Sequence, residues 1–322
     1  MTQSIAPAAF ACAPYIKEIG RGKEGARGLS TEQAQTLYAA ILRGEVSDFE
    51  LGAVLIALRV KGETIEELVG FLKAIAQEWP AHALDVQAEA QLRELEAQSQ
   101  ASGKPVVVIP SYNGARRKPN FTPLLACLLA RAGYPVLVHG LQADPTGRVT
   151  SAEVFAHLRN LPLGRPPLYM PLKAINPALD LLLQTRKVLG VRSCTHTLVK
   201  LIVPSVFSNT VLVTSYTHPE FWHLQRDVLC ATGQTALVLR AHEGEPVAGP
   251  YSTPRMDGVK AGKTWNIAER ESVFNAQPDP QPEIDAAATA RRIEQWLQAP
   301  EHMPATYLRQ VQAIEAVVNA AV

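Results

Sequence analysis

The sequence has few cysteines and lacks the short motifs that several classes of enzyme require. Its 322 residues contain no CxxC pair, which excludes zinc ribbons and thioredoxin-like sites. It also contains no HExxH zinc motif and no GxSxG nucleophile elbow. The four cysteines lie in or near apolar stretches, as reduced cysteines of cytosolic proteins do. They are Cys12, Cys127, Cys194 and Cys230. We therefore expect a cytoplasmic protein without a metal site.

An excess of charge and a long hydrophobic run are also absent. The 31 basic and 30 acidic residues give a net charge of +1, which excludes a globally basic nucleic-acid binder but not a locally basic groove. The longest apolar helical run, Leu124–Ala130, is far shorter than the roughly 20 residues that a bilayer span needs. No basic segment precedes the apolar N-terminal residues, so neither a secretory signal nor a membrane partner is expected.

The first hundred residues have the pattern of a small helical bundle. Three amphipathic runs each follow a capping-box sequence, which begins at Ser30, Ser47 and Thr64. A polar stretch over 85–100 then ends at Ser102-Gly103, where we place a domain junction. We predict a helical domain over residues 1–100, with residues 174–202 packed onto it, and a second domain over 103–322.

The second region alternates short β-branched runs with helical runs, which is typical of βαβ units and a mainly parallel sheet. The predicted strands are Val106–Ile109, Pro135–His139, Asn209–Tyr216 and Thr235–Arg240. The predicted helices are Leu124–Arg131, Ala152–Leu158, Pro177–Leu189, Phe221–Ala231, Ile284–Leu297 and Tyr307–Val318. We expect an irregular connection over 161–171 and loops over 243–282. The fold class is therefore α/β, with a small all-helical N-terminal domain and a larger α/β domain.

The segment after the first predicted strand has the features of an anion site. Asn113-Gly114 suits a tight turn, and Thr122 with Pro123 suits the start of a helix, where free N–H groups attract negative charge. Open α/β sheets bind ligands at this end of their strands. Three consecutive cations, Arg116–Lys118, stand beside the predicted turn.

A second basic stretch lies near the N-terminus. Residues 20–25 match GxGxxG, but no strand precedes them, so a dinucleotide site is not expected. The stretch is either a solvated loop or an arm that contacts the phosphates of a nucleic acid. Its cations are Lys17, Arg21, Lys23 and Arg27.

Several short motifs resemble those of anthranilate phosphoribosyltransferases. Asn120-Phe-Thr122 matches the Asn-x-Ser of that family, and His139-Gly140 matches the HG of its KHGN motif. Val191-Arg192 matches the start of the segment that faces anthranilate. The resemblance implies that a phosphate site lies at Asn113, Gly114, Asn120, Thr122, His139 and Gly140.

The departures from that family concern its diphosphate chemistry. Pro110–Gly114 replaces the GTGGD loop, and the Asp-Glu metal pair is not reproduced near Glu243-Gly-Glu245. Magnesium needs such carboxylates, so we expect no cofactor, and Mg²⁺ only if transferase activity remains.

The whole pattern is similar to the YbiB-type relatives of anthranilate phosphoribosyltransferase. This resemblance implies a homodimer that binds nucleic acid, expected to be DNA, without sequence preference and with little transferase activity. The expected contact residues are Lys17, Arg21, Lys23, Arg27, Arg116, Arg117, Lys118 and Arg192. The alternatives are a pentosyltransferase that uses phosphoribosyl diphosphate with an unknown acceptor, and a sensor of a small phosphorylated ligand.

Overall fold

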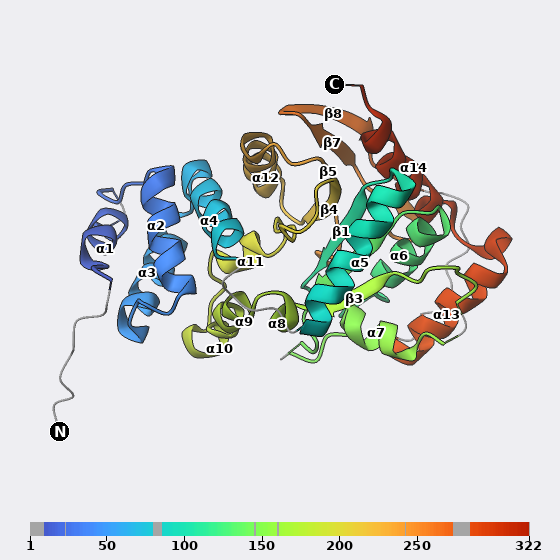
Figure 1. The fold of residues 1–322 in the computed structure, drawn as a ribbon, viewed down its shortest axis with the longest axis horizontal. Coiled ribbons are helices and arrows are strands. Elements are labelled where there is room, and N and C mark those ends of the chain that lie inside the picture. Colours follow the sequence, from blue (N-terminus) through green and yellow to red (C-terminus); the bar gives the residue numbers. More distant parts are fainter. Residues whose placement is uncertain are drawn as a thin grey trace. The chain divides into compact units, whose positions relative to one another are not determined.

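The chain divides into two compact units in a computed structural model that describes residues 10–22, 24–79, 86–144, 146–159, 161–241, 243–272 and 284–321. One unit comprises Met1–Leu84 and Asn176–Pro204, and the other comprises Asp85–Ile175 and Ser205–Val322 (Figure 1). The predicted domain junction lies after residue 100, whereas the two units divide before residue 85.

The helical unit is built from two separate segments of the chain. Its helices are α1 (Ala13–Ile19), α2 (Thr31–Leu42), α3 (Asp48–Lys61), α4 (Ile65–Glu78), α9 (Pro177–Gln184), α10 (Arg186–Leu189) and α11 (Thr195–Leu198). The helices α2, α3 and α4 begin at the three predicted capping boxes, and in each the capping side chain accepts the main-chain N–H of the third helical residue.

A buried contact explains why the later segment joins the early helices. The rings of Tyr38 on α2 and Phe71 on α4 lie 4.8 Å apart, and both side chains are fully buried. The Tyr38 hydroxyl is 3.3 Å from Thr195 Oγ1 at the start of α11. The packing of α11 therefore satisfies a buried polar group that the first four helices leave open.

The α/β unit contains a seven-stranded sheet in the order β3-β2-β1-β4-β5-β7-β8. The strands are β1 (Val106–Ser111), β2 (Val136–Gly140), β3 (Leu168–Pro171), β4 (Thr210–Tyr216), β5 (Ala236–Arg240), β7 (Met256–Lys260) and β8 (Lys263–Ala268). The strands β1, β2, β3, β4 and β5 are mutually parallel. The strand β7 runs antiparallel to β5, and β8 runs antiparallel to β7. A separate two-stranded sheet pairs β6 (Ser252–Thr253) with β9 (Glu271–Ser272).

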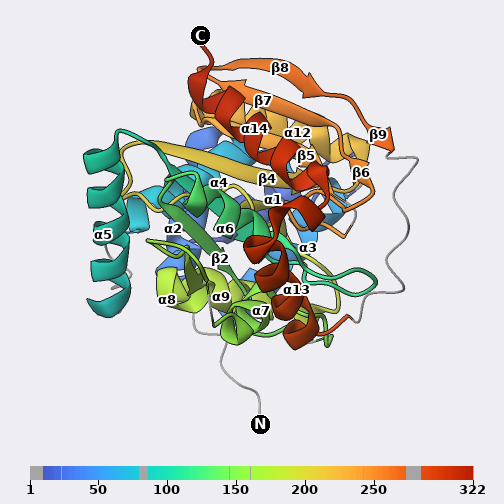
Figure 2. The same ribbon diagram turned by 90° about the vertical axis from the view of Figure 1, so that its right-hand side faces the viewer.

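The helices of this unit bury the apolar faces of the sheet. They are α5 (Val86–Ser102), α6 (Thr122–Arg131), α7 (Ser151–His157), α8 (Leu172–Ile175), α12 (Pro219–Thr232), α13 (Ala286–Gln298) and α14 (Ala305–Asn319), with a short 3₁₀ turn η1 (Pro300–His302). Residues of α6, α7, α13 and α14 form one core cluster with alternate residues of β1, β2, β4 and β5. Figure 2 shows α6, α13 and α14 over the same face of the sheet.

The helix α5 belongs to the α/β unit, although its polar sequence was assigned to the helical domain. The Glu96 carboxylate accepts the main-chain N–H and the hydroxyl of Ser208, at 3.2 and 2.5 Å. The Ser99 hydroxyl donates to the carbonyl of Lys104, just before β1, at 2.7 Å. The contact from Glu96 to Ser208, together with the buried side chains of Leu92 and Leu95, therefore holds this polar helix on the α/β unit.

Two strand regions differ from the sequence-based expectation. Leu168–Pro171 form β3, not an irregular connection, because an edge strand tolerates a terminal proline. The residues expected to be loops contain the β7–β8 hairpin, whose Ala261-Gly262 turn has positive φ angles of 48° and 73°. Such a turn suits a tight hairpin. Pro177–Leu189, predicted as one helix, is divided at Thr185 into α9 and α10.

Candidate functional site

The loop that follows β1 folds around a buried glutamate. Glu245 Oε1 accepts the main-chain N–H groups of Asn113 and Gly114, both at 2.7 Å. Its Oε2 accepts the hydroxyls of Ser111 at 2.5 Å and Thr122 at 3.3 Å. The Glu245 side chain is only 6% exposed. The main-chain and hydroxyl donors of this loop therefore hold one of the chain's own carboxylates.

Two glycines allow the backbone to approach this closely. Gly244 has a φ of +88°, and a Cβ at this position would collide with the side-chain amide of Asn113. Its carbonyl accepts the hydroxyl of Ser215 on β4 at 2.8 Å. Gly114 has a φ of +62°, and a Cβ there would lie 2.9 Å from Arg148 Cβ. The left-handed conformation at both positions therefore favours glycine.

A second glutamate holds the basic half of the same loop. The Glu243 carboxylate accepts the main-chain N–H groups of Arg116, Arg117 and Lys118 at 3.0, 2.9 and 3.3 Å. Glu243 is half-buried. Successive N–H groups that converge on one anion form a concave donor set of the kind that binds phosphates and carboxylates.

The side chains of the three basic residues point into solvent. Arg116, Arg117 and Lys118 are all exposed, and none forms an ion pair with an acid in the part of the chain that the structure describes. The loop therefore presents three positive side chains while its main-chain donors already bind carboxylates.

The start of α6 differs from the prediction. The N-cap is Phe121 and not Thr122, which is the first helical residue. The main-chain N–H of Thr122 donates to Asn120 Oδ1 at 3.1 Å, and the Asn120 amide donates to Ser151 Oγ at 3.1 Å. Asn120 thus takes the capping role from one residue before the N-cap. The Thr122 hydroxyl is drawn instead toward Glu245.

His139 and Gly140, the other predicted phosphate residues, have structural partners. His139 Nδ1 lies 2.7 Å from the hydroxyl of Tyr112, whose ring packs edge-on at 5.5 Å between centroids. A Cβ on Gly140 would collide with the carbonyl oxygen of Ser111 on the neighbouring strand. The glycine of the HG match therefore allows β1 and β2 to approach closely.

The predicted basic residues of the helical unit lie in or just after α1. Lys17 and Arg27 are exposed. The Arg21 guanidinium donates to Glu18 Oε1 at 2.7 Å and to the Lys17 carbonyl at 3.2 Å, so part of its charge is neutralised locally. Lys23 lies outside the described residues.

Arg192 lies in a second basic region of the same unit. It is exposed, whereas the neighbouring His196 is half-buried and accepts the Ser193 N–H on Nδ1 at 3.3 Å. Burial, together with the positive charges of Arg192 and Arg186, lowers the pKa of His196 to about 4. His196 is therefore neutral at physiological pH, and the charge of this region comes from its arginines and lysines.

The carboxylates of the loop do not suit a magnesium site. Both oxygens of Glu245 accept hydrogen bonds from the protein, and Glu243 faces three main-chain N–H groups. No group of three or more His, Cys, Asp or Glu residues among those described is placed to hold a metal ion. The residues present therefore do not fit the metal that diphosphate transfer needs.

The sequence patterns indicate Glu243 and Glu245 only as a metal pair that is not reproduced, and they do not predict that both carboxylates bind the loop. The available signal was the Glu-Gly-Glu order directly after β5 in an open α/β sheet. The ends of parallel strands meet at one edge of a sheet, so acids after β5 and amides after β1 can come together.

Known proteins with similar sequences identify the family. Residues 13–78 match the model of the glycosyl transferase family, helical bundle domain. The uncharacterized protein YbiB of Escherichia coli is 37% identical over 301 residues, which are 90% of this chain and 88% of that protein. The chain belongs to the YbiB-type relatives of anthranilate phosphoribosyltransferase. An anthranilate phosphoribosyltransferase of Methylobacterium nodulans is 30% identical over 45% of the chain.

Solved structures place the YbiB-type chain in the same fold. Anthranilate phosphoribosyltransferase from Thermus thermophilus matches with a TM-score of 0.58 at 19% identity, over 94% of both chains. The Saccharomyces cerevisiae enzyme in complex with PRPP and Mg matches with a TM-score of 0.57 at 13% identity, over 96% of this chain and 97% of that one. The predicted fold, a helical domain with a mainly parallel α/β domain, is confirmed.

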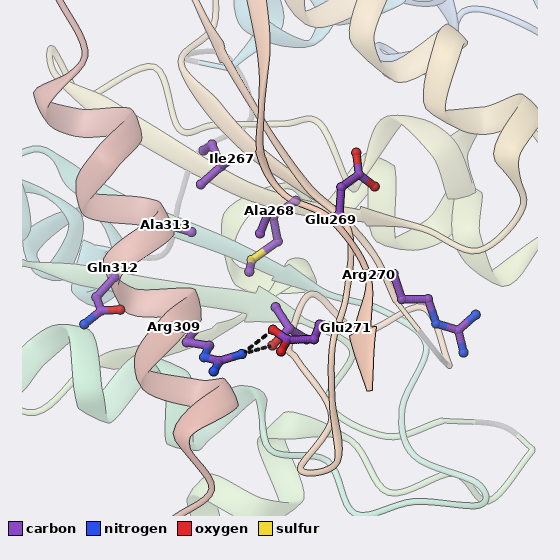
Figure 3. A pocket seen from close by; sticks show the side chains of 10 residues that line it. Ile267, Ala268, Glu269, Arg270, Glu271, Arg309, Gln312 and Ala313 are labelled. Atoms are coloured by element: carbon purple, nitrogen blue, oxygen red, sulfur yellow. Dashed lines mark hydrogen bonds and ion pairs between the residues drawn. The ribbon is translucent and has the colours of Figure 1, made fainter. Parts of the chain in front are cut away.

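A cavity of about 600 Å³ lies elsewhere in the α/β unit of this YbiB-type protein. Apolar residues such as Met256, Ile267 and Ala313 line it together with polar and charged ones, and an ion pair of 2.7 Å joins two of the lining residues, Arg309 and Glu271 (Figure 3). It borders β8, which three strands separate from β1. None of the loop-site residues named above is among those that line it. None of the helices in the described residues has the length and apolarity of a membrane span.

Proposed function

We propose that this protein binds nucleic acid without sequence preference, through phosphate contacts of basic side chains. The observation that carries the proposal is the exposed tripeptide Arg116–Lys118 on the loop after β1. Adjacent long cations on a fixed loop suit the regularly spaced charges of a phosphate backbone. Lys17, Arg21, Lys23 and Arg27 of the helical unit, together with Arg192, are the further proposed contacts.

The occupied anion site disfavours the alternative, a transferase that uses phosphoribosyl diphosphate. The N–H groups of Asn113 and Gly114 and the hydroxyl of Thr122, which would hold a diphosphate, already hold Glu245. A substrate diphosphate would have to displace a buried carboxylate and leave it without partners, which is costly. An anionic ligand would therefore be attracted mainly by the exposed side chains of Arg116, Arg117 and Lys118. We propose that no magnesium or other cofactor is needed.

The proposal includes a homodimer formed through α3. Phe49 and Val60 of this helix are 81% and 75% exposed, and Ile56 is 38% exposed. Their spacing places them on one helical face. Exposed apolar side chains on one face are typical of an interface, and a second copy of the chain would bury them while bringing a second set of basic residues.

Two parallel titrations test the proposal. A labelled mixed-sequence oligonucleotide is titrated by fluorescence anisotropy over a range of salt concentrations, as single-stranded DNA, duplex DNA and RNA. Phosphoribosyl diphosphate with magnesium is titrated by calorimetry. We expect salt-dependent, sequence-independent binding of the oligonucleotide and no heat with the diphosphate. The opposite pair of results would contradict the proposal and favour the transferase.

A further inference from the structure

The main-chain N–H groups of the basic loop form a donor set that faces one anion. Three successive amides, those of Arg116, Arg117 and Lys118, donate to Glu243 between 2.9 and 3.3 Å. The contact lies at the surface, and Glu243 is half-buried, whereas Glu245 is 6% exposed. Water and ligands therefore reach the first carboxylate but not the second.

A phosphodiester has the chemistry that this donor set accepts. Like a carboxylate, it carries one negative charge over two oxygens, and main-chain N–H groups are common phosphate ligands in nucleic-acid complexes. The three residues that supply the amides also supply three exposed cationic side chains. Main-chain donors and side-chain charge thus come from the same tripeptide.

We propose that the amides of Arg116, Arg117 and Lys118 are a binding site for one backbone phosphate, and that Glu243 occupies this site in the free protein. This inference rests on the proposed function, the binding of nucleic acid. Glu243 is then an internal competitor. A phosphate that enters the site must displace the carboxylate, and the displaced negative charge stays beside the nucleic acid.

Removal of the Glu243 charge should therefore tighten binding. Two unit charges about 4 Å apart in water repel by about 1 kcal/mol, so Glu243→Gln is expected to lower the Kd for an oligonucleotide about fivefold. The glutamine keeps a side-chain oxygen that can accept from the loop. Glu243→Ala removes the acceptor as well, and we expect it to bind at least as tightly as Glu243→Gln.

The matched control is Glu301→Gln. It removes the same unit of charge from an exposed side chain whose closest described ionic partner is His302, at 3.8 Å, and it touches no residue of the loop. We expect its Kd to stay within twofold of the wild-type value. Equal Kd values for Glu243→Gln and Glu301→Gln, or weaker binding by Glu243→Gln, would overturn the inference, provided that circular dichroism shows folded variants.

The outcomes separate this inference from the proposed function. If the wild-type protein binds no oligonucleotide, the proposed function fails. If the wild-type protein binds and Glu243→Gln binds no more tightly, only the inference fails.

Should the variants not fold, the wild-type protein provides a second measurement. Its amide resonances for 116–118 should shift more on addition of oligonucleotide than those of other exposed loops. Absence of that shift overturns the inference.

Discussion

Glu245 accepts the main-chain N–H of Gly114 at 2.7 Å, across 131 residues of sequence. This hydrogen bond joins the segment after β5 to the loop after β1 in the middle of the sheet. It also supplies, from within the chain, the negative charge that the end of a parallel sheet attracts. The Glu245 carboxylate therefore holds the loop after β1 to the segment after β5 from within the chain.

Loss of the Glu245 carboxylate should destabilise the α/β unit. Glu245→Ala would leave the buried N–H groups of Asn113 and Gly114 without an acceptor, at a cost of about 3 kcal/mol in the free energy of unfolding. Urea unfolding followed by circular dichroism measures this change. Glu269→Ala, at an exposed position, should change the value by less than about 0.5 kcal/mol. Equal stabilities for the two variants would contradict a structural role for Glu245.

A substitution at Gly140 tests whether this glycine is needed for the close approach of β1 and β2. Gly140→Ala should destabilise the fold by several kcal/mol, since the new Cβ would collide with the Ser111 carbonyl between paired strands. Gly164→Ala is the control, because nothing lies within 4 Å of its Cβ position. Thermal unfolding should give a clearly lower Tm for Gly140→Ala alone. A Tm equal to that of the control would show that the strands can separate at no cost.

Local signals predicted most of the fold. The capping boxes at Ser30, Ser47 and Thr64 act within three residues, so the helix starts could be found without tertiary information. The β-branched runs likewise predicted β1, β2, β4 and β5 to within one or two residues at each end.

The site was less predictable because its contacts are long-range. Thr122 looks like an N-cap, but its hydroxyl turns to Glu245, 123 residues away in sequence. No pattern near Arg116 indicates that Glu243 will accept its N–H, because 127 residues separate the two. The assignment of α5 failed for the same reason, as its contact from Glu96 to Ser208 spans 112 residues.

His196 should make the stability of the helical unit depend on pH. Its pKa is about 4 in the folded protein, mainly because of burial, against about 6.5 in an unfolded chain. Between these two pKa values the unfolded state binds more protons than the folded state. The free energy of unfolding therefore increases with pH in this range, and it decreases as the pH falls from 6.5 toward 4. The loss is at most about 3 kcal/mol.

Urea unfolding at several pH values measures this dependence. His196→Gln should flatten the stability profile between pH 4 and 6.5. His302→Gln, whose side chain is 77% exposed, is the control and should keep the wild-type profile. If the stability of His196→Gln depends on pH as that of the wild-type protein does, a group other than His196 causes the dependence.

Phe49→Glu with Val60→Lys should prevent dimer formation if α3 is the interface. Charged side chains on an apolar contact are strongly unfavourable when buried, whereas both positions are exposed in the single chain. Light scattering after size exclusion should then give the mass of one 35.0 kDa chain, against two for the wild-type protein. Val86→Lys, at an 83% exposed apolar position outside α3, is the control and should stay dimeric.

Arg116→Ala with Arg117→Ala should weaken nucleic-acid binding equally for all sequences. Each lost phosphate contact lowers the slope of log K against log salt by about 0.9 on duplex DNA, so the pair should lower it by about 2 if both arginines bind phosphates. The control is Arg291→Ala with Arg292→Ala, which removes the same charge from α13. If only net charge matters, both double variants should lose affinity to a similar extent. If the loop contacts phosphates directly, the slope of log K against log salt should change only in the variant of Arg116 and Arg117. An unchanged slope in the loop pair would remove this loop from the binding surface, and any affinity that remained would have to come from other basic residues, such as those around α1 and Arg192.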